Sequence, residues 1–158
     1  MDKRNKYNIW LSQMMLDEMM QDLLLWYPNE TGGVLMGYWS SNEAIITGII
    51  YGGPSAIRAK MSFIPDHTYQ KISIAEWYKK SERTETYLGD WHTHPNANAY
   101  LSIIDKQTFR KIANYKQARL TNPIMIVLGT RPNEIKAWVY KKSNIFFNSF
   151  VIARLKIF

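Results

Sequence analysis

Two histidines in the sequence stand where they could share one metal ion. His92 and His94 are separated by one residue, in a stretch that we expect to be a strand from Tyr87 to His94. Alternate side chains of a strand point to the same face, so both imidazoles would face one side. Pro95 supports this arrangement, because the residue before a proline is held in an extended conformation. Neutral imidazoles are common zinc ligands, so the pair indicates a metal site.

A third ligand is expected from Asp105, which follows at the start of a predicted helix. Its carboxylate would complete three protein ligands, the number that leaves a fourth position for water in a catalytic zinc site. Ser102 and Asp105 also have the spacing of an ordinary helix N-terminal capping box, with Ser102 as the N-cap. We favour the hydrolytic zinc site over a capping box alone, because the histidine pair and the Ser-x-x-Asp pattern occur together.

With an upstream glutamate, these residues resemble the JAMM signature of the JAB/MPN (Mov34/PAD-1) zinc metalloproteases. The matching positions are Glu30 in Glu30-Thr31-Gly32-Gly33, the pair in His92-Thr93-His94, Ser102 and Asp105. Further segments resemble the short bacterial branch found beside ubiquitin-activation-like enzymes in CBASS-type antiphage operons and in integrative elements. These are Gly52-Gly53-Pro54, Phe63-Ile64-Pro65-Asp66 and Tyr87-Leu88-Gly89-Asp90-Trp91.

The resemblance implies a JAMM-type zinc isopeptidase or peptidase with an antiviral role. His92, His94 and Asp105 would hold Zn2+, which activates a water molecule as the nucleophile. Glu30 would be the general base, and Ser102 would donate a hydrogen bond to the oxyanion. The implied substrate is a ubiquitin-like or otherwise C-terminally conjugated protein. The implied partners are ubiquitin-activation or conjugation-like enzymes of the same operon.

The predicted elements favour one α/β domain over residues 1–158. Strands are expected at 7–11, 30–39, 43–51, 87–94, 123–128 and 135–140, and helices at 13–27, 66–82 and 102–119. Residues 52–62 are expected to form a loop over the site, and 144–158 an edge strand or a short helix. This order favours a mixed-sheet sandwich with flanking helices, and the resemblance implies the JAB/MPN fold with its cytidine-deaminase-like layering.

Several side chains are expected to shape this domain. We expect the glycines Gly32 and Gly33 to let their strand lie tightly against its neighbour, which would place Glu30 near the metal. The methionines of the first helix are expected in the core. In the third helix, the residues expected to point inward are Ile103, Phe109, Ile112, Ala113 and Tyr115. His67 is expected to be a surface or capping residue rather than a ligand of a second metal.

Composition narrows the remaining classes of function. The chain has no cysteine, which excludes disulfides and thiolate zinc sites and removes half of the zinc deaminase signature. No stretch approaches the ~18 apolar residues of a membrane-spanning helix. Asp17 and Glu18 interrupt what would be the apolar part of an export signal. We therefore expect a cytoplasmic protein without a membrane partner.

Two alternatives belong to other classes. The net charge of +7 suits a nucleic-acid backbone, but the basic residues occur in scattered pairs and no nucleic-acid motif accompanies them. A solvated surface explains them better. A non-enzymatic MPN-type scaffold would bind a partner protein without chemistry, and the complete metal signature argues against it.

Overall fold

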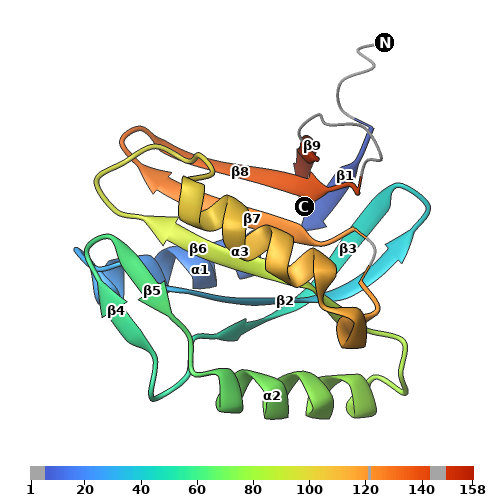
Figure 1. The fold of residues 1–158 in the computed structure, drawn as a ribbon. Coiled ribbons are helices and arrows are strands. Elements are labelled where there is room, and N and C mark those ends of the chain that lie inside the picture. Colours follow the sequence, from blue (N-terminus) through green and yellow to red (C-terminus); the bar gives the residue numbers. More distant parts are fainter. Residues whose placement is uncertain (1–5, 121, 143–148) are drawn as a thin grey trace.

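The computed structural model describes residues 6–120, 122–142 and 149–158 (Figure 1). Its first half contains β1 (Asn8–Leu11), α1 (Gln13–Trp26), β2 (Gly32–Ser40), β3 (Glu43–Tyr51), β4 (Ile57–Ala59), β5 (Ser62–Ile64) and α2 (His67–Lys80). Its second half contains β6 (Thr86–His94), α3 (Ile103–Asn114), a 3-10 turn at Lys116–Ala118, β7 (Ile124–Thr130), β8 (Asn133–Tyr140) and β9 (Phe150–Ile157).

Seven strands form one mixed sheet in the order β1-β3-β2-β6-β7-β8-β9. β6 and β7 pair in parallel and are connected through α3, whereas β2 pairs antiparallel with β6 and β8 with β7. The predicted α/β architecture, a mixed sheet with flanking helices, is confirmed. The sheet also closes on itself, because β1 pairs with both β3 and β9.

The C-terminal strand corrects one prediction. An edge strand or short helix was expected for the tail, but β9 lies between β8 and β1 and is paired on both sides. The first part of that predicted segment, residues 144–148, lies outside the described residues. Whether β9 is an edge or an interior strand depends on the strands available to pair with it. Its second partner, β1, lies at the other end of the chain, so the sequence around β9 does not reveal the pairing.

Side-chain alternation divides the core into an inner and an outer layer. Along β7, Ile124, Ile126 and Leu128 face the inner cluster, together with residues of α1. Met125 and Val127 point the other way and pack under α3, which lies across β6 and β7 in Figure 1. Each such buried side chain contributes about 1.5–3 kcal/mol relative to exposure. The strand that neighbours the histidine-bearing β6 is therefore firmly held on both faces.

Helices α1 and α2 cover different surfaces. Ser12 caps α1 by accepting a hydrogen bond from Met15 N, and the helix buries Met15, Met19 and Leu23 in the inner cluster. The expected core position is thus confirmed for Met15 and Met19, but it was wrong for Met14, which is 69% exposed. Helix α2 packs on the outer face of β2 and β3 through Ile74 and Trp77. Among the described residues, no helix has the length and apolar character needed to cross a membrane.

Two local predictions were wrong. The segment 52–62 is not only a loop, because β4 and β5 form a hairpin around residues 60 and 61. Its strands are three residues each, too short for alternation to be read from sequence. Ile103 is 78% exposed and Tyr115 is 49% exposed, although Phe109 is fully buried. Ile103 precedes Phe109 by six residues, about 240° around the helix, so the two cannot face the same core.

Candidate functional site

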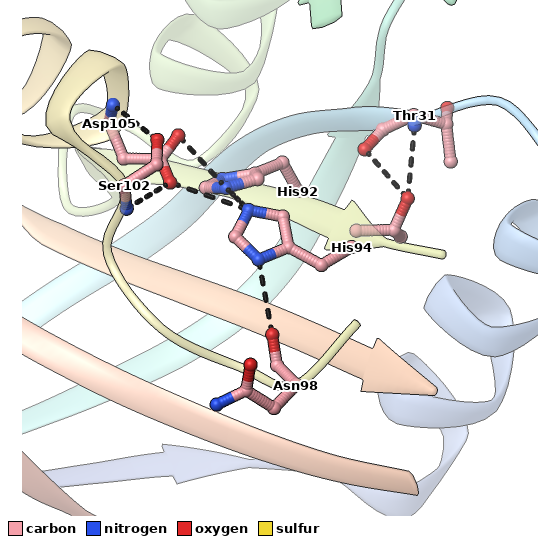
Figure 2. Close-up of polar contacts among 7 residues, drawn as sticks. Thr31, His92, His94, Asn98, Ser102 and Asp105 are labelled. Atoms are coloured by element: carbon pink, nitrogen blue, oxygen red, sulfur yellow. Dashed lines mark hydrogen bonds and ion pairs between the residues drawn. The ribbon is translucent and has the colours of Figure 1, made fainter. Parts of the chain in front are cut away.

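Strand β6 and helix α3 bring three predicted ligand side chains to one point (Figure 2). The Nε2 atoms of His92 and His94 are 3.1 Å apart. Asp105 Oδ1 lies 3.2 Å from His92 Nε2, and Asp105 Oδ2 lies 3.4 Å from His94 Nε2. One nitrogen or oxygen atom from each side chain thus lies within 4.8 Å of the others.

These separations and donor types fit a zinc ion. Ligand atoms about 2.0–2.1 Å from a tetrahedral zinc are about 3.3 Å from one another, close to the 3.1, 3.2 and 3.4 Å found here. Two imidazole nitrogens and one carboxylate oxygen are ligands that zinc accepts. The three residues can therefore hold one divalent cation.

The pKa shifts of Asp105 and His94 are consistent with a cation site. Burial acts to raise the pKa of Asp105, but the close contacts with the imidazoles of His92 and His94 outweigh it and hold that pKa well below its usual range. Burial acts to lower the pKa of His94, but the contact with Asp105 outweighs it and raises that pKa. The Asp105 carboxylate is therefore ionised at neutral pH, and its negative charge favours a cation beside the two imidazoles.

The predicted ligand side chains are oriented by contacts outside the group. His94 Nδ1 lies 3.2 Å from the carbonyl oxygen of Asn98. A hydrogen bond donated there fixes the tautomer in which Nε2 keeps its lone pair for a metal. Asn98 was not predicted, and a sequence cannot reveal it because only its backbone takes part.

Ser102 and Asp105 form the capping box that the sequence allowed. Ser102 Oγ accepts a hydrogen bond from Asp105 N at 3.1 Å, and Asp105 Oδ2 accepts one from Ser102 N at 2.8 Å. The two interpretations of this pattern are therefore compatible. The cap holds the Asp105 carboxylate at the helix N-terminus, where it reaches the histidines.

Glu30 lies just before β2, within range of the charges of the three predicted ligand residues. Burial raises the pKa of its carboxyl. His92 and His94 act to lower that pKa and Asp105 acts to raise it, but burial is the largest effect. Its backbone N–H donates to Ala59 O of β4 at 2.8 Å. The segment that was expected to be a loop thus borders the site as a hairpin strand.

The expected close approach at the two glycines is confirmed. Gly32 pairs with His92, and a Cβ on Gly32 would lie 2.4 Å from Trp91 O and 2.9 Å from His92 Cβ. A Cβ on Gly33 would lie 1.8 Å from Ile50 O. Side chains at these positions would push β2 away from its neighbours, so glycine sets the distance between Glu30 and β6.

Two further residues of the site were missed. Thr93 alternates to the face opposite the histidines, where its hydroxyl bonds the backbone of Thr31. Alternation along β6 could have revealed it. The ring of Tyr100 lies 4.9 Å from that of His94 and is 45% exposed.

His67 is exposed at the start of α2, which Asp66 caps, as expected for a surface histidine.

Similarity to known proteins extends over most of the chain. A family model described as prokaryotic homologs of the JAB domain matches residues 12–141. A probable metalloprotease of Sinorhizobium fredii is 42% identical over 135 residues, covering 83% of this chain and 82% of that protein. A CD-NTase/cGAS isopeptidase of Enterobacter hormaechei is 28% identical over 133 residues, covering 80% and 69%.

A solved structure is similar in fold. The solution structure of a Desulfitobacterium hafniense protein has a TM-score of 0.71 with this chain, at 16% identity, and the match covers 94% of this chain and 92% of that one. At this identity the likeness concerns the arrangement of helices and strands.

Proposed function

The chain belongs to the family of prokaryotic homologs of the JAB domain, and on that premise we propose that it is a zinc-dependent isopeptidase or peptidase whose catalytic domain spans residues 1–158. The observation that carries the proposal is the convergence of His92, His94 and Asp105 beside Glu30. We assign the three converging residues as the zinc ligands. When bound, zinc supplies Lewis acidity, which polarises a scissile carbonyl and makes a water molecule a better nucleophile.

Glu30 has the proposed role of general base. It borders the ligand group without belonging to it, so it can move protons while the ligands stay in place. Its carboxylate would accept the proton of the attacking water and pass it to the leaving amine. A positioned general base contributes on the order of 10² to 10⁴ in rate.

Ser102 is proposed to stabilise the oxyanion. Its oxygen accepts the N–H of Asp105, and a hydroxyl that accepts one hydrogen bond still has a proton to donate. That proton, at a helix N-terminus beside the ligand group, can reach the oxygen of a scissile carbonyl. The helix N-terminus favours negative charge at the same place.

The proposed substrate is a protein joined through its C-terminus to an amine of another protein. Relatives named as isopeptidases support cleavage of such a bond, and the CD-NTase in their name supplies a first candidate. A ubiquitin-like protein is the second candidate. We further propose that conjugation enzymes of the same operon attach the protein that this enzyme removes, and that the pair acts in antiviral defence.

A non-catalytic scaffold with this fold is disfavoured. A scaffold needs neither the general base nor converged ligands, whereas this chain has Glu30 within range of the charges of a converged His92, His94 and Asp105 group.

Replacement of Glu30 tests the proposal. Glu30→Gln removes the proton acceptor with little change of shape, so zinc content and melting temperature should match wild type. Single-turnover cleavage should fall by about 10² to 10⁴. The substrates are a CD-NTase and a ubiquitin-like protein, each joined by its C-terminus to a lysine side chain of a target.

Glu18→Gln is a matched control, because Glu18 lies on α1 outside the ligand group. It should cleave at the wild-type rate. Wild-type cleavage by the Glu30→Gln protein would contradict the assigned mechanism. If wild-type protein loaded with zinc cleaved neither conjugate, the scaffold function would replace the one proposed.

A further inference from the structure

A polar network, buried at Thr31 and Asp22 and partly exposed at Arg58, joins helix α1 to the β4–β5 hairpin through Thr31, the neighbour of Glu30. Thr31 Oγ1 donates to Asp22 Oδ2 of α1 at 2.7 Å and accepts from Arg58 Nε of β4 at 3.0 Å. Thr31 is fully buried and Asp22 is 9% exposed. One hydroxyl therefore lies between an acidic and a basic side chain.

The backbone of Thr31 is tied to the strand that carries the ligands. Thr93 N donates to Thr31 O at 2.9 Å, and Thr31 N donates to Thr93 Oγ1 at 3.0 Å. Thr93 lies between His92 and His94 in β6. Figure 2 shows Thr31 beside the strand that bears both histidines. The residue after Glu30 is thus fixed to the residue between the two ligands.

Arg58 fixes the other side of Glu30. Its guanidinium lies 4.0 Å above the centre of the Trp26 ring and 5.8 Å from the centre of the Phe63 ring. Stacking on these rings and the hydrogen bond to Thr31 therefore both restrict the guanidinium. The next residue, Ala59, accepts the backbone N–H of Glu30 at 2.8 Å. Movement of Arg58 would therefore displace the backbone partner of Glu30.

A gain in folding stability does not explain why the side chains of Asp22 and Arg58 both contact the buried hydroxyl of Thr31. The cost of removing charges from water offsets most of the stability that their contacts contribute. Apolar side chains of similar volume often stabilise the folded protein as well or better. A buried network in which each member has its partner does fix one arrangement of the chain. The arrangement fixed here is that of residues 30 and 31 relative to β6.

We propose that Asp22, Thr31 and Arg58 are positioning residues that hold Glu30 at its working distance from the ligand group. The inference rests on the proposed role of Glu30 as general base. The three residues act through Glu30 and through the backbone around it, without contact with the substrate. They also couple the β4–β5 hairpin to the general base.

The first test replaces Thr31. Thr31→Val keeps the shape but removes both hydroxyl bonds, and should lower kcat by about tenfold or more, since a 1 Å misplacement costs about 10²-fold. KM and zinc content should stay within about twofold, because binding groups are untouched. Thr31→Ser restores the hydroxyl and should restore most of kcat. Equal kcat in both variants, on a per-folded-molecule basis, would overturn the inference.

The second test is a double-mutant cycle. Arg58→Met should lower kcat by about tenfold in the wild-type background and by less than about twofold in the Glu30→Gln background, because its effect passes through Glu30. Lys60→Met in the turn of the same hairpin is the matched control and should leave kcat unchanged. The same loss from Arg58→Met in both backgrounds would overturn the inference.

Amide hydrogen exchange provides a readout that needs no substrate. In Arg58→Met the amides of residues 30 and 31 should exchange faster, while those of β7 keep wild-type protection. Unchanged protection at residues 30 and 31 would overturn the network itself. If instead exchange rises as expected but wild-type protein cleaves neither conjugate, the proposed function fails and the inference about Glu30 fails with it. If cleavage depends on Glu30 but not on Thr31 or Arg58, only the inference fails.

Discussion

The two sides of the site are built in different ways. The side with the proposed zinc ligands, here called the ligand side, comes from one continuous strand, loop and helix. In it, His92 and His94 share a face of β6 and Asp105 follows at the start of α3. The side with Glu30, the proposed general base, is here called the base side and is assembled from distant segments. Glu30 precedes β2, its N–H bonds to the β4–β5 hairpin, and its neighbour Thr31 is held by Asp22 of α1.

Because of this difference, the two sides depend on the rest of the fold to different degrees. On the ligand side, a capping box and the loop carbonyl of Asn98 orient the side chains locally. On the base side, the position of Glu30 depends on contacts between elements far apart in sequence. Changes on the ligand side should therefore remove the metal, and changes on the base side should alter rate while metal remains.

The largest expected effect comes from the ligands themselves. His92→Ala or Asp105→Ala should lower zinc content from about one per chain to near zero. Cleavage should fall by about 10³-fold or more, since metal Lewis acidity is worth several kcal/mol. Elemental analysis of protein purified without added zinc measures the first effect, and single-turnover assay the second.

His67→Ala serves as the control for the ligand variants, because His67 is an exposed histidine outside the ligand group. It should retain full zinc and activity. Full zinc content in both His92→Ala and Asp105→Ala would disprove the ligand assignment and end the contrast between the two sides.

A smaller effect is expected at Ser102, which belongs to the ligand side without being a ligand. Ser102→Ala should cost about 0.5–2 kcal/mol of folding stability through loss of the cap. As an oxyanion donor, its loss should also lower kcat by about 10²-fold. Zinc should stay bound, because the backbone N–H of residue 102 still donates to Asp105.

Ser102→Thr keeps a hydroxyl and can cap, so it should recover both stability and rate. Urea unfolding and kcat per folded molecule distinguish the two roles. An unchanged kcat in Ser102→Ala would leave Ser102 with the capping role alone.

The smallest effect on rate is expected at Gly32, where the two sides meet. In Gly32→Ala the new Cβ would lie 2.4 Å from Trp91 O, so β2 must move away from β6 at a cost of about 1–3 kcal/mol. We expect the accompanying displacement of Glu30 to be less than the ~1 Å that costs about 10²-fold, so kcat should fall by about tenfold.

Gly48→Ala is the matched control for the glycine variant. Its Cβ would meet the Trp77 ring on the outer face, so it should destabilise the fold and leave kcat per folded molecule unchanged. Equal losses of kcat in the two variants would show that general instability, rather than the position of Glu30, sets the rate.

Local signals carried the successful predictions. The alternation of a strand placed both histidines on one face, and the Ser-x-x-Asp pattern predicted the cap that the structure shows at Ser102. The mixed sheet followed from the order of strand and helix patterns. The predictions that failed, at the β4–β5 hairpin, at β9 and at Ile103, depend on partners or on helix rotation that short windows of sequence do not contain.

The sequence by itself determined the residue types and spacing of the site, because strand alternation directs His92 and His94 to one face and the capping box directs Asp105 at the start of its helix. Only the tertiary structure decided that Asp22 and Arg58 meet at Thr31, and that the hairpin accepts the N–H of Glu30. Such contacts form when closure of the sheet and packing of α1 bring distant segments together. Their energies depend on burial and distance, which no local pattern encodes.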